Sequence, residues 1–168
     1  AWPEHEVVWR DASPLTPADL SWLHARCATN GIELVPCLNG FGHMERFLRH
    51  DTYRHRAECP DGAPALVGEG TSPPTTLAPT PDNARFAIDL FAAYLEAAPA
   101  ARIHIGGDEP FELGMGVSAA AVAERGRAAV YLEHLRRLID PFLADREVLF
   151  WGDVLRDHPE HVAALPRD

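Results

Sequence analysis

The sequence predicts an α/β fold, and within that class part of a (β/α)8 TIM barrel. Short apolar segments alternate with amphipathic helices, and polar, glycine-bearing residues follow each apolar segment. A whole barrel typically takes about 250 residues, which is more than this chain has. We therefore expect residues 1–168 to form a single partial barrel domain, corresponding to about strands 2 to 5 or 6.

The composition is that of a soluble globular domain and argues against some classes of partner. Hydrophobic residues make up 46% of the chain, charged residues 24%, and the formal net charge is −10. Nucleic acids and anionic membranes attract basic surfaces, so we expect neither as a partner. The three cysteines show no CxxC spacing, which disfavours a disulfide framework and favours a reducing compartment such as the cytoplasm.

The first round of the pattern is a helix followed directly by a strand. In "SPLTPADLSWLHARCATNG", Thr16 can cap a helix that begins at Pro17, and the Asn-Gly pair at residues 30–31 stops it. One face of this helix carries a predicted buried stripe of Leu20, Leu23 and Cys27. The next segment, "IELVPCLN", is short and apolar, as a strand buried on both faces is.

Two further rounds follow the same order. "TPDNARFAIDLFAAYLEAAP" repeats the capping arrangement at Thr80 and Pro81 and leads into the strand "RIHI". "SAAAVAERGRAAVYLEHLRRLIDPFL" predicts a helix with a break at Gly126, and it leads into "EVLFWGDVL". Strands that alternate with helices indicate a parallel sheet, which is either open or closed into a barrel.

The polar clusters favour the barrel over the open sheet. "NGFGH", "GGDEP" and "WGD" each come just after an apolar strand. Active sites of (β/α)8 barrels are built from loops at the carboxyl ends of several strands, which is where these clusters fall. An open doubly wound sheet more often shows one GxGxxG loop, and the sequence has none.

The adjacent acids Asp108 and Glu109 have two interpretations. The pair could cap and begin a helix whose first turn contains Pro110. Alternatively, the glycines at residues 106–107 let the backbone turn both carboxylates toward one pocket, where they supply a proton donor and an anion for glycoside hydrolysis. Taken alone, a histidine such as His43 is more often structural and a strand-end Trp such as Trp151 is more often a core residue.

Together these motifs resemble family 20 glycoside hydrolases, the β-N-acetylhexosaminidases. "HIGGDEP" looks like the His-x-Gly-Gly-Asp-Glu motif of that family. "GIELVPCLNGFGHMERFLRH" resembles its preceding strand and Gly-His turn, and "LFWGDVL" resembles its later Trp strand. The Phe-Gly-His-Met-Glu form and "EPFELGMG" are more similar to the hexosaminidase D-like branch than to secreted or lysosomal members.

The resemblance implies substrate-assisted retaining hydrolysis of a glycoside that ends in N-acetylglucosamine or N-acetylgalactosamine. Glu109 matches the general acid, and Asp108 matches the residue that orients the acetamido group of the substrate. His43 matches a histidine that tunes the acid, and Trp151 matches a wall of the sugar pocket. No metal and no cofactor is implied.

Three more residues complete the predicted site. Asn39 stands where many family members have Asp, Asp153 follows the Trp strand, and His5 lies near where an earlier strand should end. All three are predicted to bind substrate or support the acids.

Two alternatives to this enzyme stay open. The chain could be a noncatalytic or vestigial sugar-binding fragment, because no counterpart of the family's sugar-binding Arg or acetamido-contacting Tyr strands is found. A metal-dependent hydrolase using His43, His104 and Asp108 is the other, although no HxH or HExxH spacing supports it.

Overall fold

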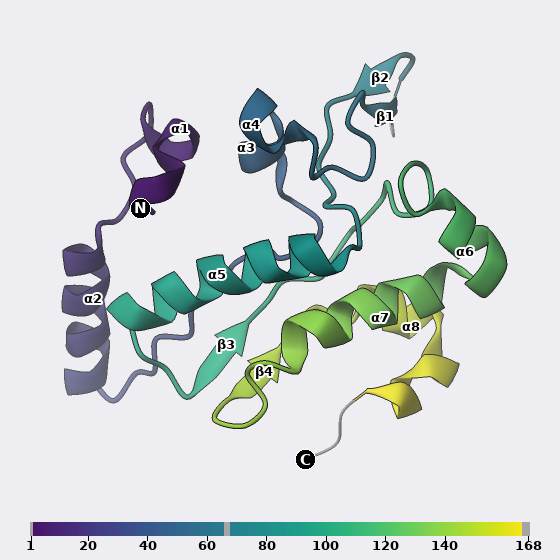
Figure 1. Ribbon diagram of the computed structural model, residues 1–168. Coiled ribbons are helices and arrows are strands. Elements are labelled where there is room, and N and C mark those ends of the chain that lie inside the picture. The colour runs from purple at the N-terminus through teal and green to yellow at the C-terminus, as the bar shows by residue number, and fades with distance from the viewer. Residues whose placement is uncertain (1, 66–67, 166–168) are drawn as a thin grey trace.

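The computed structural model describes residues 2–65 and 68–165 (Figure 1). Its α-helices are α1 (Glu6–Trp9), α2 (Pro17–Thr29), α3 (Glu45–Leu48), α4 (Asp51–Arg54), α5 (Pro81–Ala97), α6 (Ala119–Arg125), α7 (Arg127–Ile139) and α8 (Asp153–Asp157). Two 3-10 helices are η1 (Pro3–His5) and η2 (Pro159–Ala164). The strands are β1 (Ala63–Pro64), β2 (Thr71–Ser72), β3 (Arg102–His104) and β4 (Glu147–Leu149).

Parallel strand segments form the centre of the molecule. β3 pairs with β4 in parallel, with His104 opposite Leu149. On the other side of β3, Cys37 forms an isolated parallel bridge with His104. Each of these segments is separated from the next by helices along the chain, as in βαβ units. The parallel order predicted from the sequence is therefore confirmed.

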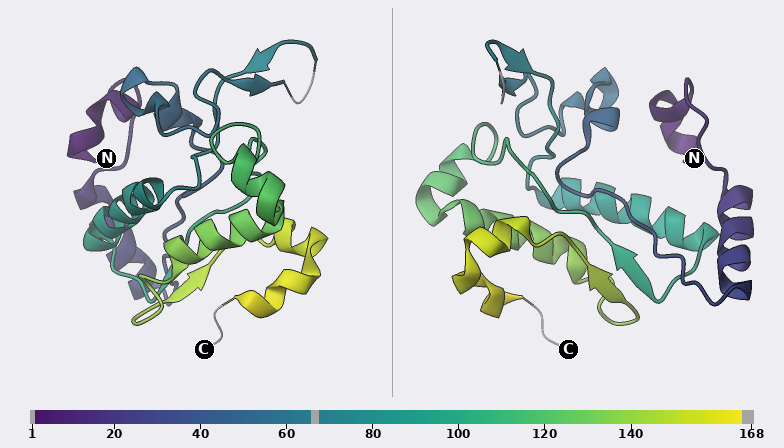
Figure 2. Two further views of the ribbon diagram at one scale, coloured as in Figure 1. Left: turned by 45° about the vertical axis from the view of Figure 1, so that its right-hand side comes forward. Right: turned by 180° about the vertical axis from the view of Figure 1, so that it is seen from behind.

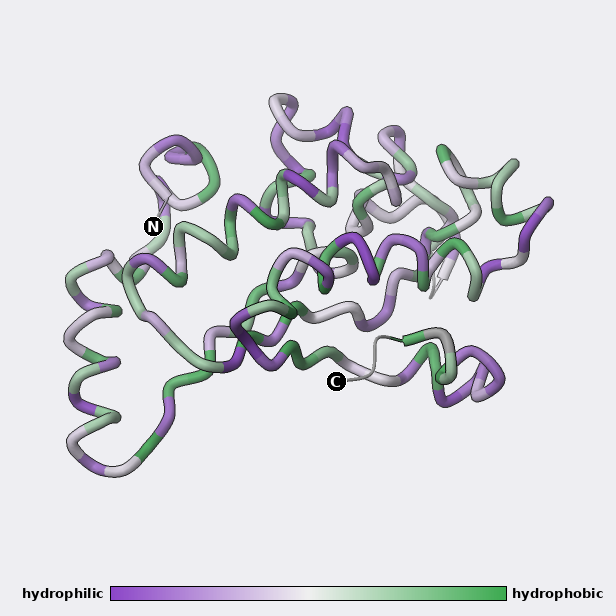
Figure 3. The backbone as a smooth tube through the Cα atoms, turned by 60° about the horizontal axis from the view of Figure 1, so that its bottom comes forward, coloured by the Kyte–Doolittle hydropathy of each residue, from purple (hydrophilic) through white to green (hydrophobic). Residues whose placement is uncertain are grey.

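Helices α5 and α7 run side by side and cover one face of the strands (Figures 1 and 2). Ile103 and Ile105 are buried in the same hydrophobic core as Phe91 of α5 and Leu135 of α7. Figure 3 shows hydrophilic and hydrophobic residues alternating along the helices, as amphipathic helices require. The strands are thus held from the helix side, and His104, which alternates with the two isoleucines, is only partly buried.

The helix ends lie where the sequence predicts them, because they depend on local chemistry. Thr16 and Asp19 form a capping box at the start of α2, each side chain accepting a hydrogen bond from the backbone N–H of the other. The Thr80 hydroxyl accepts from the N–H of Asn83 at the start of α5. Gly126, with φ of 85°, separates α6 from α7, so the predicted break is confirmed.

Two predictions about the first round are only partly right. "IELVPCLN" forms the single bridge at Cys37 rather than a full strand, because Pro36 has no N–H to donate and the segment has β3 alone as a neighbour within the described residues. On α2 only Leu20 is fully buried, and Leu23 and Cys27 are half-buried. The cause is that α2 stands at the edge of the molecule and packs against α5 (Figure 1).

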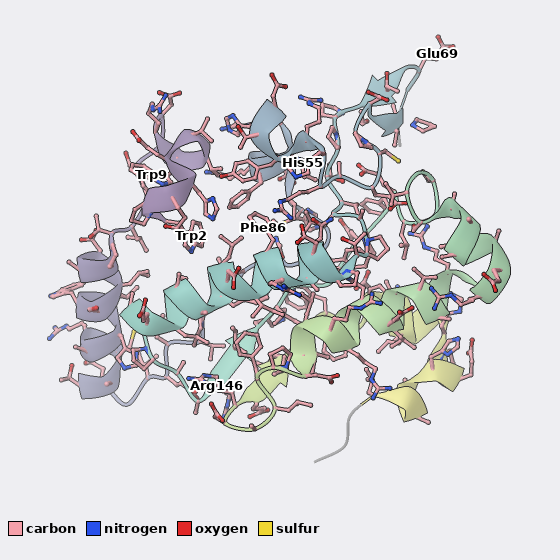
Figure 4. The ribbon with its side chains drawn as sticks, in the orientation of Figure 1. Trp2, Trp9, His55, Glu69, Phe86 and Arg146 are labelled. Carbon is pink, nitrogen blue, oxygen red and sulfur yellow. The ribbon has the colours of Figure 1, made fainter. Side chains whose placement is uncertain are left out.

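The N-terminal segment contains η1 where the sequence suggested the end of an earlier strand. The indole N–H of Trp2 donates to the carbonyl of Leu90 on α5, and the indole N–H of Trp9 donates to the carbonyl of Trp2 (Figure 4). These contacts attach α1 to α5. Between residues 2 and 36 the structure has no strand.

Within residues 2–65 and 68–165, none of the helices combines the length and the apolar character needed to cross a membrane.

Candidate active site

The acid pair lies on an irregular loop that follows β3. Gly106 and Gly107 both have positive φ, 71° and 92°, which side chains other than glycine rarely adopt. A Cβ on Gly106 would also lie 2.4 Å from the side-chain oxygen of Asn39. The predicted role of the two glycines as the turn that redirects Asp108 and Glu109 is therefore consistent with the backbone geometry.

No helix begins at Pro110. Residues 111–118 form turns, and α6 starts at Ala119. The helix-capping interpretation of Asp108 and Glu109 is therefore wrong.

A single imidazole contacts both acids. The Nε2 atom of His43 lies 3.2 Å from Oδ2 of Asp108 and 3.5 Å from Oε2 of Glu109. The side chain of His43 is 37% exposed, that of Asp108 25% and that of Glu109 52%, so the three groups meet at the surface rather than in the core. His43 is therefore placed at the acid pair, where the sequence predicts it.

The contact between these residues is held by strained and closely packed backbone. His43 and Glu109 have φ of 54° and 44°, and they are the non-glycine residues with positive φ in the described part of the chain. Such conformations cost free energy and concentrate at functional sites. Next to His43, a Cβ on Gly42 would lie only 2.4 Å from the carbonyl oxygen of Asp108, so only glycine lets the two turns approach this closely.

Asp153 adds a third carboxylate. It is the first residue of α8, and its Oδ2 accepts a hydrogen bond of 3.3 Å from the backbone N–H of Glu109. Its Oδ1 atom and the Oδ1 atom of Asp108 are buried without a protein hydrogen-bond partner. Buried polar atoms normally have a partner, so these two oxygens are candidates to meet a bound ligand.

Tyr131 of α7 is fully buried beneath the acid loop's backbone at Gly107. Its hydroxyl donates to the carbonyl of Gly107 at 2.9 Å, which ties the acid loop to the core. Burial, together with the nearby Asp153 and Asp108, raises the pKa of Tyr131 far above its ordinary value. The phenol therefore stays protonated and acts as a permanent donor.

Trp151 lies beside the acids and is open to solvent. Its side chain is 53% exposed, and its ring centroid is 4.8 Å from that of His104. Burial lowers the pKa of His104, against the charge of Asp108, which raises it. Because Trp151 is exposed, the interpretation of this indole as a core residue is wrong.

Neither of the two remaining predicted residues, Asn39 and His5, borders a cavity that Glu109 lines. Asn39 lies against the start of the acid loop, since a Cβ on Gly106 would meet its side-chain oxygen at 2.4 Å, and it borders a cavity of about 390 Å³ together with His43. His5 instead lies in an aromatic cluster, where its Nδ1 is 2.6 Å from the hydroxyl of Tyr53 and its ring packs edge-on against Phe47.

Two buried glutamates near the site were not found from the sequence. Glu58 is fully buried and accepts hydrogen bonds from the N–H groups of Gly114, Gly116 and Ser118 and from the Ser118 hydroxyl. Glu112, which is 4% exposed, accepts from the N–H groups of residues 75–76. Both acids hold the loop that follows the acid pair. An acid between apolar neighbours, as in "FEL", is the signal that marks Glu112.

Cavities of moderate size meet at Glu109. One of about 330 Å³ is bordered by Asp108, Glu109, Trp151 and Asp153, and another of about 280 Å³ is bordered by Glu109 and His43 but not by Asp108. A larger cavity of about 680 Å³ lies between the N-terminal segment, α2 and α5. Neither acid borders that larger cavity. The candidate site is therefore identified by the position of Asp108 and Glu109, not by the volume of the cavity.

Among the described residues, no group of three or more His, Cys, Asp or Glu side chains is arranged to hold a metal ion. The metal-dependent alternative therefore has no ligand set in this part of the chain.

The fold is shared with solved glycoside hydrolases. A Flavobacterium johnsoniae chitobiase matches 92% of this chain and 25% of its own length, with a TM-score of 0.68 and 16% identity. A mutant Streptomyces plicatus β-hexosaminidase in complex with its product, GlcNAc, matches 85% of this chain and 26% of its own length, with a TM-score of 0.58 and 21% identity. The chain thus has the fold of part of a (β/α)8 barrel, which it shares with these glycoside hydrolases.

Sequence comparison finds two curated relatives, both named hexosaminidase D. The chain is 30% identical to hexosaminidase D of Homo sapiens over 153 residues and 26% identical to hexosaminidase D of Bos taurus over 164 residues. These matches cover 86% and 93% of this chain, but the chain spans only 29% and 44% of the two relatives. No family model matches the sequence. The relationship to family 20 hexosaminidases inferred from the motifs is confirmed.

Proposed function

We propose that this chain carries the catalytic acids of a β-N-acetylhexosaminidase, as part of one barrel domain over residues 1–168. The observation that supports the proposal most directly is the contact of one His43 nitrogen with both Asp108 and Glu109. It holds the two carboxyl groups together on the border of a cavity of about 330 Å³. The relatives named hexosaminidase and chitobiase, and the hexosaminidase solved with GlcNAc, support a carbohydrate substrate, and the substrate proposed here is a glycoside that ends in N-acetylglucosamine or N-acetylgalactosamine.

In the proposed reaction, Glu109 is the general acid. Its half-exposed carboxyl gives a proton to the glycosidic oxygen, and the bond between that oxygen and the anomeric carbon breaks. The acetamido oxygen of the substrate attacks the anomeric carbon from the opposite face and forms a cyclic oxazolinium ion. Glu109 then takes a proton from water as that water opens the ring, so the configuration is retained and the enzyme is restored.

Asp108 is the residue proposed to act on the acetamido group. Its Oδ2 contacts His43, and its Oδ1 is buried without a partner and so is free to accept the acetamido N–H. An anion there also stabilises the positive charge of the oxazolinium ion. Trp151 offers an exposed indole face on which an apolar face of the sugar can stack, while Asp153 holds the backbone of Glu109 in position.

The test is release of nitrophenol from a nitrophenyl N-acetyl-β-glucosaminide by the purified chain. We expect Glu109→Gln to lower kcat about 100-fold or more, because general acid catalysis typically contributes about 10² to 10⁴. Glu124→Gln, which changes an exposed acid on α6, is the matched control and leaves the rate unchanged. The nitrophenyl β-glucoside should not react, because it lacks the acetamido nucleophile.

A second candidate function is sugar binding without turnover. It is favoured by the short span of the chain, which covers 29% of the human relative. Binding of N-acetylglucosamine by the intact chain, with no nitrophenol released, would establish that candidate for this chain. Release that is equal in the intact chain and in Glu109→Gln would contradict the proposed acid.

A further inference from the structure

A second cavity is bordered by Glu109 and His43 but not by Asp108. It has a volume of about 280 Å³, and its apolar wall is made of Ala63, Pro64, Phe111 and Met115. Ala63 and Pro64 come from the β1–β2 hairpin, and Phe111 and Met115 come from the turns that follow the acids. Parts of the chain about 50 residues apart thus form one hollow beside the proposed general acid.

Three cavities border Glu109, and they differ in the residues that line them. Asp108 and Trp151, the proposed contacts of the sugar, border only the cavity of about 330 Å³. Glu109, the proposed proton donor to the glycosidic oxygen, borders all three. The third cavity, of about 290 Å³, is lined largely by charged side chains, among them Arg127, Arg156 and Asp157. If the sugar occupies the cavity with Asp108, an apolar group beyond the glycosidic oxygen fits the cavity with Met115 better than this charged one.

The chemistry of the second cavity suits a hydrocarbon group. Phe111 is 38% exposed and Met115 is 52% exposed, so two large apolar side chains face solvent next to the acid. The carboxylate of Glu112 also borders the cavity, but its oxygens already accept hydrogen bonds from the Thr75 hydroxyl and from the N–H groups of Thr75 and Thr76. Glu45 and Ser72 supply the remaining polar side chains of the lining apart from His43.

The loop that carries the two apolar side chains is preorganised. Glu58 accepts three backbone N–H groups between Gly114 and Ser118, and Arg127 donates to the carbonyls of Pro110 and Leu113. A loop fixed at both ends loses little entropy when it binds a ligand. Exposed Phe and Met on such a loop are therefore available as a preformed contact surface.

We propose that this cavity is an aglycone site that takes an alkyl or aryl group, and that Phe111 and Met115 set this preference. The proposal rests on the proposed function, because it assumes that the bond cleaved lies at Glu109. It extends that function by naming the substrate class as hexosaminides with a hydrocarbon aglycone rather than a second sugar.

The test uses thio-linked alkyl β-N-acetylglucosaminides, which resist hydrolysis, with methyl, butyl and octyl chains. We expect the Kd to fall about two- to fourfold for each added CH2 group until the cavity is filled. The two methionines are natural reporters for methyl NMR. Met115 borders the proposed aglycone site, whereas Met44 borders the cavity of about 390 Å³ that contains Asn39. Longer chains should shift the Met115 methyl signal and leave Met44 unchanged.

Substitutions on one loop provide the matched comparison. Met115→Gln should weaken binding of the octyl glycoside about tenfold. Val117→Gln removes an equally exposed apolar side chain that does not border the cavity, and it should leave the octyl Kd unchanged. Equal effects of the two substitutions would overturn the assignment of the site to Met115.

The other outcomes separate this proposal from the proposed function. If the methyl, butyl and octyl glycosides all bind with the same Kd, the aglycone site is overturned and the proposed function is not. A shift at Met44 instead of Met115 places the aglycone in the cavity with Asn39 and also overturns it. A thio-linked disaccharide that binds as tightly as the octyl glycoside overturns the hydrocarbon preference. Absence of binding by all of the glycosides, including the methyl one, overturns the proposed function and the aglycone site together.

Discussion

Two pairs of carboxyl groups near one loop differ in what their oxygens contact. Glu58 and Glu112 are buried, and their oxygens accept hydrogen bonds from backbone N–H groups and hydroxyls. Asp108 and Glu109 are partly exposed, share the imidazole of His43, and leave one buried oxygen of Asp108 unpaired. The first pair has its acceptor capacity occupied by the protein, and the second keeps capacity for a ligand.

The backbone shows the same difference. Glu109 has φ of 44°, a conformation that costs free energy in an L-residue, whereas neither Glu58 nor Glu112 has positive φ. Strain at Glu109 is sustained because the neighbouring loop is fixed by the two buried glutamates and by Tyr131. One pair thus stabilises the loop, and the other is held in place by it. This distinguishes structural from candidate catalytic acids without reference to relatives.

The largest expected effect on stability is at Glu58. Glu58→Ala leaves the N–H groups of Gly116 and Ser118 without their acceptor, whereas the N–H of Gly114 keeps the Ser118 hydroxyl, and we expect the free energy of unfolding to fall by about 3 kcal/mol. Glu109→Ala should change it by less than about 1 kcal/mol, because no backbone donor depends on its side chain among the described residues. Urea denaturation of both variants measures this. Equal losses would show that the two kinds of acid do not differ.

A smaller effect is expected where the two site turns touch. Gly42→Ala places a Cβ 2.4 Å from the carbonyl oxygen of Asp108 and 3.1 Å from that of Glu109, so the turns must separate. We expect a loss of roughly 1 to 3 kcal/mol, typical of overpacking, and weaker binding of N-acetylglucosamine because His43 moves away from the acids. Urea denaturation and calorimetric titration measure the two effects.

The control for this substitution is Gly152→Ala. No heavy atom lies within 4 Å of a Cβ at Gly152, and its φ of −94° suits any residue. Its free energy of unfolding should change by less than about 0.5 kcal/mol. A loss at Gly152 as large as that at Gly42 would mean that the close approach to Asp108 is not the cause.

The parts of the structure that the sequence predicted are those fixed by local chemistry. The caps at Thr16 and Thr80 and the break at Gly126 depend on residues within one turn, so they can be read from the sequence. The loop-borne acids after β3 could also be placed, because carboxyl ends of parallel strands meet at one edge.

The parts that could not be predicted depend on contacts between distant residues. Glu58 bonds to N–H groups about 60 residues further along the chain, and no local pattern indicates such partners. His5 was placed at the site, but its contacts are with Tyr53 and Phe47, which a helix-rich N-terminal segment brings together. The segment around Cys37 pairs with β3 at a single bridge, and the number of neighbours a strand has is not encoded in its own residues.

Two histidines also differ in burial. From this difference we predict the smallest of the effects on the free energy of unfolding. His43 is exposed beside the acids, whereas His134 of α7 is fully buried against the ring of Phe41. Burial, and to a lesser degree the charge of Arg137, lowers the pKa of His134 to about 3. The unfolded chain has an ordinary histidine pKa near 6.5 and therefore binds a proton that the folded chain excludes between about pH 6.5 and 3.

Stability should consequently fall as the pH falls through this window. We expect His134 to cost about 1 kcal/mol between pH 7 and pH 5.5, since each pH unit below the unfolded pKa contributes up to about 1.4 kcal/mol. Urea denaturation at the two pH values measures this for the intact chain and for His134→Leu, which should lose that part of the pH dependence. His55→Gln, at a surface histidine (Figure 4), should keep it. If His134→Leu retains the full dependence, the buried histidine is not its source.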